Sequence, residues 1–146
     1  MADNLWERRK VGKPPSFSSP EQMWTDAVEY FKWCDKNAPM EAKPFSFQGL
    51  TELTDVPKMR AMTQSGLCTY LNIGVSTYHD YKNKPEYSEV TKAIDSVMYD
   101  QKFVGAAAGL LNANIIARDL GLAEKTEAEI KVNTPKNFNA FYDEED

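Results

Sequence analysis

Basic side chains gather in two short stretches of this chain, and both suit the binding of phosphate groups. One stretch lies in residues 1–18. The other lies between Pro57 and Lys84, where four Lys or Arg face one Asp. Lys and Arg neutralise the phosphates of duplex DNA whatever its base sequence. The residues predicted to contact DNA are Arg8, Arg9, Lys10, Lys13, Lys58, Arg60, Ser76, Thr77, His79, Lys82 and Lys84.

The second stretch has the spacing of a helix-turn-helix over residues 63–84. Thr63 is placed to cap a first helix, Asn72-Ile73-Gly74 offers a turn, and Ser76 is placed to cap a second helix. We expect Gly74 to supply any positive φ that this turn needs. The second helix of such a unit can lie in the major groove of DNA. Asp80 weakens this interpretation, and a helical pair packed for structure alone is the alternative.

Residues 1–18 are predicted to form a basic arm. Pro14 and Pro15 favour an extended chain there. Such an arm can bind phosphates by charge alone, and the alternative is a terminus that is merely solvated.

Composition argues against several functional classes. The 17 basic and 22 acidic residues give a net charge of −5, so DNA does not wrap the whole surface. No apolar run is long enough to span a bilayer, and the start lacks a secretory signal, so we expect a cytosolic protein without a membrane partner. One histidine, two cysteines and the lack of a glycine-rich phosphate loop predict no enzyme, no cofactor and no metal site.

The chain is predicted to be mainly α-helical, with one short β-hairpin. A first helix begins after Ser19, with Pro20 at its first position and Gln22 completing a capping box. A hairpin over residues 43–56 turns at Gln48-Gly49. Since an isolated hairpin is marginally stable, it must pack on helices or on another copy of the chain. The buried face of the first helix is predicted to hold Met23, Trp24, Ala27, Val28, Phe31 and Cys34.

A long helix beginning at Pro85 is predicted to form the oligomerisation region, residues 85–122. Its apolar residues are spaced alternately by four and three, with Gln101 as the one polar break. Gly105 and Gly109 would let a neighbouring helix approach closely, or would mark a bend. Asn112 and Asn114 would fix the helix register or face solvent. The predicted contact residues are Val90, Ile94, Val97, Val104, Ala108, Leu111 and Ile115.

The C-terminal tail, residues 123–146, is predicted to be flexible and acidic. It holds seven acidic and three basic residues. Phe138, Phe141 and Tyr142 precede the acidic end and are predicted to dock on a partner protein. The alternative is a solvated end without a partner.

Several segments of the chain carry a likeness to one protein family. They are Trp6-Glu7-Arg8, Ser19–Trp33, Lys58-Met-Arg-Ala-Met-Thr63, Gly66-Leu-Cys68, Tyr99-Asp-Gln-Lys-Phe103, Gly105-Ala-Ala-Ala108 and Leu110–Leu122. Residues 5–122 resemble the small terminase subunit of short-tailed, headful-packaging bacteriophages. The run from Tyr99 to Leu122 is the most distinctive part of this resemblance.

The resemblance implies a ring-forming, non-catalytic DNA-packaging protein of the host cytoplasm that is not retained in the mature virion. Such rings recognise the packaging site on double-stranded phage DNA. They recruit and regulate the large terminase subunit, which carries the ATPase and the nuclease. Some relatives end in a basic tail, whereas this chain ends in Tyr142-Asp-Glu-Glu-Asp146, so the arm or the region Pro57–Lys84 is expected to contact DNA instead.

The sequence leaves two alternative functions open. A helix-turn-helix transcription regulator would form a dimer on a palindromic operator, so a measured dimer would favour it. A nuclease would cleave DNA in a metal-dependent reaction.

Overall fold

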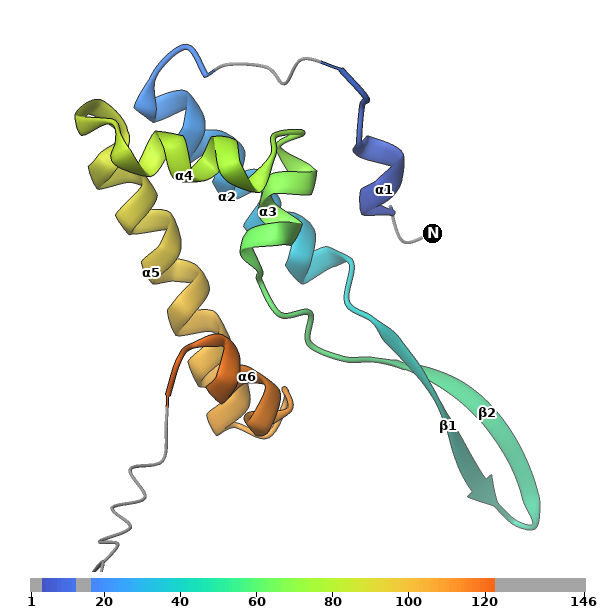
Figure 1. The fold of residues 1–146 in the computed structure, drawn as a ribbon. Helices are drawn as coiled ribbons and strands as arrows, with labels where there is room; N and C mark the ends of the chain where they lie inside the picture. Colours follow the sequence, from blue (N-terminus) through green and yellow to red (C-terminus); the bar gives the residue numbers. More distant parts are fainter. Residues whose placement is uncertain (1–3, 13–16, 123–146) are drawn as a thin grey trace, which may run out of the picture.

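The computed structural model describes residues 4–12 and 17–122. Six helices and one two-stranded antiparallel sheet make up this part of the chain, so the mainly helical fold class is confirmed (Figure 1). Among the described residues, none of the helices combines the length and the apolar character of a membrane span. In order, the elements are α1 (Leu5–Arg8), α2 (Pro20–Lys36), β1 (Met40–Phe47), β2 (Leu50–Pro57), α3 (Gln64–Tyr70), α4 (Val75–Asn83), α5 (Pro85–Ala107) and α6 (Ala113–Asp119).

Helix α2 begins where its sequence predicts. The Ser19 hydroxyl accepts a hydrogen bond from the Gln22 amide nitrogen at 3.1 Å. The capping box is only half formed, because the Gln22 side chain donates to Asp26 at 2.8 Å instead of returning to Ser19. Four of the six predicted core positions of this helix are buried, whereas Val28 is half-buried and Trp24 is exposed. Tyr30 and Trp33 are buried beside them and were not predicted.

One hydrophobic core joins α2, α3, α4 and α5. Its centre includes Met23, Leu67, Tyr78 and Ile94, each with at most 1% of its surface exposed. Burial of large apolar side chains is the main favourable contribution to folding. These four helices therefore share one core, to which the hairpin contributes no buried side chain.

Strands β1 and β2 form the predicted hairpin. Gln48 and Gly49 both have positive φ, 50° and 81°, which is the backbone of a two-residue hairpin turn. Phe47 pairs with Leu50, and the register continues to Met40 and Pro57. The hairpin projects away from the helices (Figure 1) and its side chains are mostly exposed. The predicted support from helices is therefore absent in the described part of the chain.

The prediction of one helix running towards Leu122 is wrong, because α5 ends at Ala107. Gly109 has a φ of 73°, and the Leu110 amide donates back to the Gly105 carbonyl at 2.8 Å. This is the Schellman pattern that ends helices at a glycine. Two roles were predicted for the glycines, close approach of another helix or a bend, and Gly109 therefore marks a bend. Asn112 then caps α6 by accepting from the Ile115 amide at 3.1 Å.

Helix α6 lies against the end of α5 (Figure 1). Lys102 of α5 forms an ion pair with Asp119 of α6, and Ile116 is the buried residue of α6. Gly105 allows close packing here, since an added Cβ would lie 2.6 Å from the Met59 sulfur and 2.8 Å from Leu111 Cδ1.

Gln101, the polar break in the apolar spacing of α5, holds the loop that precedes α3. Its side-chain nitrogen donates to the Arg60 carbonyl at 2.8 Å. Its side-chain oxygen accepts from the Met62 amide at 3.0 Å. A polar residue is required at this position because both backbone groups are partly buried.

Candidate nucleic-acid interface

Helices α3 and α4 form the predicted helix-turn-helix, but a different residue supplies the turn. Thr63 caps α3 by accepting from the Gly66 amide at 3.0 Å. Asn72 takes the left-handed conformation, with φ 57°, and the Ile73 amide donates to the Cys68 carbonyl at 3.0 Å. Asparagine tolerates this conformation better than most residues. Gly74, the residue predicted to need positive φ, is extended with a φ of −80°.

Helix α4 begins one residue before the predicted cap. Gly74 occupies the cap position and Val75 is the first helical residue, so Ser76 lies inside the helix. Gly74 has no side chain to accept from the first-turn amides, and α4 therefore starts without a side-chain cap. Ser76 is instead an exposed side chain of the first turn.

One face of α4 packs against the core. The Tyr78 hydroxyl donates to Asp95 Oδ1 at 2.9 Å, and Lys82 Nζ lies 2.7 Å from Asp95 Oδ2. Burial, together with the nearby Asp95 carboxylate, raises the pKa of Tyr78. The Lys82 ammonium is therefore directed at α5. The exposed residues of α4 are Val75, Ser76, His79, Asp80 and Asn83.

The N-terminal segment, residues 4–12, is packed on the turn between α3 and α4. Arg9 Nη1 donates to the Ile73 carbonyl at 2.7 Å, and the Lys10 amide donates to Asn72 Oδ1 at 2.9 Å. The Arg8 guanidinium lies 4.0 Å above the Tyr70 ring. The arm and the helix-turn-helix, treated as separate candidates in the sequence, are thus brought together. No local spacing signals this contact, because it joins residues 62 and 64 positions apart.

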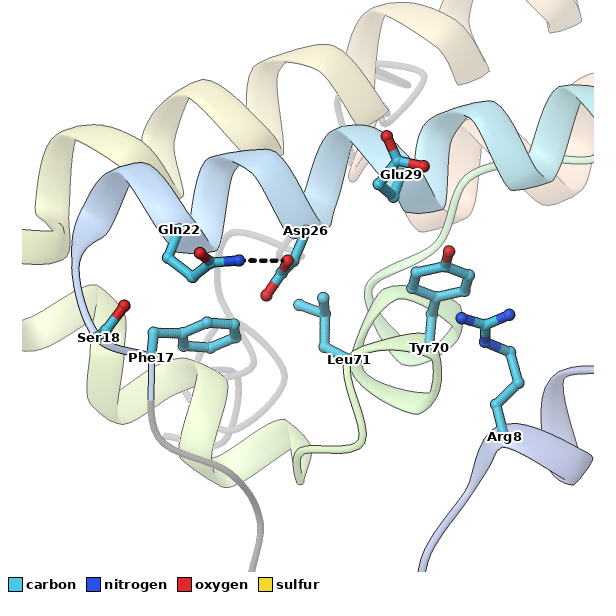
Figure 2. Close-up of a pocket in the computed structure, with 8 residues that line it drawn as sticks. All are labelled: Arg8, Phe17, Ser18, Gln22, Asp26, Glu29, Tyr70 and Leu71. Carbon is cyan, nitrogen blue, oxygen red and sulfur yellow. Dashed lines mark hydrogen bonds between the residues drawn. The ribbon is translucent and has the colours of Figure 1, made fainter.

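An open cleft of about 400 Å³ lies beside this contact (Figure 2). Arg8 and Tyr70 stand at one end, and Ser18 and Gln22 stand at the other. Asp26 and Glu29 of α2 lie along it. Lys32 holds the pKa of Glu29 below its usual range through a hydrogen bond, so this carboxylate is charged at neutral pH. The acidic lining repels phosphate, and the cleft is no candidate for contact with DNA.

The other predicted basic residues are spread over the molecule. Lys58 pairs with Glu41 at 3.0 Å at the base of the hairpin. Arg60 donates from Nε to the Asn37 carbonyl at 2.6 Å and lies over the Trp33 ring. Lys84 lies 4.6 Å from the centre of the Tyr81 ring, and Thr77 is half-buried. Lys13 lies outside the described residues.

The predicted oligomerisation residues differ in their burial, and they fall into a core group and a surface group. Ile94 is fully buried in the core and Val90 packs against that core, so Ile94 cannot contact another subunit in this fold. Val97 and Val104 line an open groove of about 510 Å³ together with Met59 and Met62. Ala108 and Ile115 are exposed, and Leu111 is half-buried beside Gly105.

Further exposed apolar residues lie on the hairpin and on α5. Phe45, Phe47, Leu50 and Leu53 are each 56–76% exposed. Tyr99 and Phe103 stack on each other on the surface of α5, with ring planes 6° apart. The sequence prediction for α5 did not include this pair, because it followed a single row of apolar residues spaced by four and three.

The acidic, histidine and cysteine side chains of residues 4–12 and 17–122 do not form a metal-binding cluster. No three His, Cys, Asp or Glu side chains come close enough there to hold a metal ion. Both cysteines are buried, and burial raises the pKa of Cys68 to about 11. The predicted docking residues Phe138, Phe141 and Tyr142 lie outside the described residues.

Comparison with known proteins adds two findings. Residues 12–128 match the protein family described as "DNA-packaging protein gp3". A curated relative, the "Terminase, small subunit" of Salmonella phage P22, is 46% identical over 128 residues. That alignment covers 87% of this chain and 79% of the relative.

Proposed function

The chain belongs to the DNA-packaging protein gp3 family of small terminase subunits, and we propose that it forms a non-catalytic ring. The ring recognises the packaging site on double-stranded phage DNA. It then recruits the large terminase subunit and regulates its ATPase and nuclease. This work takes place in the host cytoplasm, before the mature virion is complete.

The DNA contact is carried by one observation, the packing of the N-terminal segment on the helix-turn-helix. It puts the exposed Lys10 beside the turn that leads into α4, where Ser76 and His79 are also exposed. A duplex approaching this corner meets positive charge and hydrogen-bond donors from two separate parts of the chain. Because only a few basic groups are presented per subunit, several subunits in a ring must act together for useful affinity.

The ring is supported by apolar side chains that the described residues do not cover. They lie on the α5–α6 end and on the hairpin. Exposed apolar surface of this extent marks protein contacts. A cyclic assembly gives each subunit two neighbours, so both surfaces can be covered by copies of the same chain.

Recruitment of the large subunit is assigned to the C-terminal tail. Phe138, Phe141 and Tyr142 supply apolar anchors, and the acidic end suits a basic protein surface. The same acidic end repels DNA, so the DNA contact and the docking function are placed at different ends of the chain. Deletion of residues 133–146 should leave the ring and its DNA binding intact while weakening stimulation of the large subunit's ATPase.

Native mass spectrometry and fluorescence anisotropy test the ring and the DNA contact together. We expect one closed assembly of more than four subunits, and weaker binding to a labelled packaging-site duplex after the double change Lys10→Gln and His79→Ala. Lys43→Gln is the matched control, because it removes one positive charge from the hairpin. A dimer would contradict the ring and favour a transcription regulator. Unchanged affinity of the double variant at low salt would contradict the assigned surface.

A further inference from the structure

We propose that Arg9 is a positioning residue of the DNA-contacting surface: it fastens residues 4–12 to the α3–α4 turn, so that Lys10 is held where it meets a phosphate. The inference rests on the proposed function. It assigns different roles to two neighbouring basic residues that composition alone does not distinguish. Arg9 acts on the protein, and Lys10 acts on the DNA.

The Arg9 side chain is bonded to a rigid part of the fold. Its Nη1 lies 2.7 Å from the Ile73 carbonyl oxygen, the short distance expected when the donor is charged. The Ile73 side chain is 1% exposed, and its amide is bonded to the end of α3. The guanidinium is thus tied to a peptide that cannot move without disturbing the core.

Asn72 provides the second fastening point. Its side-chain oxygen accepts from the Lys10 amide at 2.9 Å, while its backbone has the left-handed conformation that ends α3. The backbone of Lys10 is therefore fixed, and its exposed side chain is left to reach outward. With Arg8 on the Tyr70 ring, three successive residues of the segment contact the end of α3 and its turn.

Fastening the segment before DNA arrives strengthens binding without adding a contact. A loose segment loses conformational freedom when it binds, and a fixed one has already lost it. Removing a fastening bond should therefore weaken binding while the number of phosphates contacted stays the same. Removing a phosphate contact should also reduce the dependence of affinity on salt, because fewer counterions are released.

Asn72→Gly tests the second fastening point, and Arg9→Leu tests the first. Glycine accepts the left-handed conformation readily, the net charge is unchanged, and only the acceptor for the Lys10 amide is lost. It also keeps every trypsin site of the segment. We expect cleavage after Arg8, Arg9 and Lys10 to be about 3- to 10-fold faster than in the wild type, the range for loss of one hydrogen bond. An unchanged melting temperature will show that the helical unit is intact.

The binding of a labelled duplex is then measured over a range of salt concentrations. For Asn72→Gly and Arg9→Leu we expect affinity about 3- to 10-fold lower with the salt dependence of the wild type. For Lys10→Gln we expect the slope of log affinity against log salt to fall by about 0.9 per engaged subunit.

Two results would overturn the assignment. One is a wild-type rate of cleavage after Arg8 and Lys10 in Arg9→Leu, the variant that lacks the bond to the Ile73 carbonyl. The other is a loss of salt dependence in Arg9→Leu equal to that of Lys10→Gln, which would make Arg9 a phosphate contact. Failure of the wild-type protein to bind any duplex would contradict the proposed function. It would not decide whether the segment is fastened, because trypsin cleavage is measured without DNA and answers that question separately.

Discussion

The helical unit and the hairpin differ in the burial of their apolar side chains. In the unit of α2–α5, residues such as Tyr78 and Ile94 are fully enclosed. In the hairpin, Phe45, Phe47, Leu50 and Leu53 are more than half exposed. The first region is complete within one chain, whereas the second is incomplete until something covers it. This difference separates residues whose change should unfold the protein from residues whose change should alter its assembly.

The hairpin is nevertheless well specified along its own length. Its turn residues have the positive φ values that a tight two-residue turn requires. Glu41 bridges Lys43 and Lys58 near the base, although pairs this exposed contribute little to stability. Local rules thus determine its shape and register, while its burial depends on a partner.

The largest difference in folding stability should appear between substitutions at two residues of α5 that are less than one turn apart. Ile94→Ala removes a fully buried side chain and should lower the free energy of unfolding by about 2–5 kcal/mol. Val97→Ala, on the exposed side, should lower it by less than about 1 kcal/mol. Urea denaturation at several protein concentrations measures both. Equal losses would show that the two sides of α5 are not different.

High pH should destabilise the helical unit. Burial raises the pKa of Cys68 from 9.0 to about 11, so the unfolded chain loses this proton first. The contribution of the neutral thiol is complete below pH 9 and is lost as the pH rises to about 11. Two pKa units correspond to about 2–3 kcal/mol. Tyr30 and Tyr78, whose pKa values burial also raises, act in the same direction at higher pH.

Unfolding curves recorded between pH 8 and 10.5 provide the measurement. Cys68→Ala should flatten the early part of the decline, because the thiol is gone. A wild-type stability that stays constant over this range would contradict the assignment to Cys68.

A smaller loss of folding stability is expected when a methyl group is added at a close contact between α2 and α3. A Cβ added at Gly66 would lie 2.5 Å from the Tyr30 hydroxyl and 2.8 Å from Thr63 Oγ1. Gly66→Ala should therefore cost about 1–3 kcal/mol, since a rigid ring and a helix cap must both shift. Gly105→Ala is the control. Its close neighbours are the flexible ends of Met59 and Leu111, so its cost should be less than that of Gly66→Ala. The reverse order in thermal unfolding would contradict this packing.

The smallest effect on stability is expected at the hairpin tip. Phe47→Ser with Leu50→Ser should change the free energy of unfolding of the single chain by less than about 0.5 kcal/mol, because both side chains are already exposed. The same pair of changes should lower the number of subunits or the stability of the assembly in native mass spectrometry. Wild-type assembly of the double variant would remove the hairpin from the proposed ring contacts.

Sequence rules predicted those elements that depend on neighbouring residues. Ser19 and Thr63 cap helices as their spacing indicates, and Pro85 opens α5. The same rules misplaced the cap of α4 at Ser76 and left Gly109 as either a packing residue or a bend. A glycine is compatible with both outcomes, and only the packing of Ile116 and the pairing of Lys102 with Asp119 favour the reversal.

Local sequence patterns were enough to predict the helical content, the hairpin turn and the basic character of the two stretches that contribute to the candidate interface. These follow from backbone preferences and local charge, which act over a few residues. The packing of distant segments directs Lys82 at Asp95, buries Ile94 in the core and brings Arg9 to the Ile73 carbonyl. Those outcomes depend on which distant groups compete for the same donor or the same buried space, and the order of residues along the chain does not carry that information.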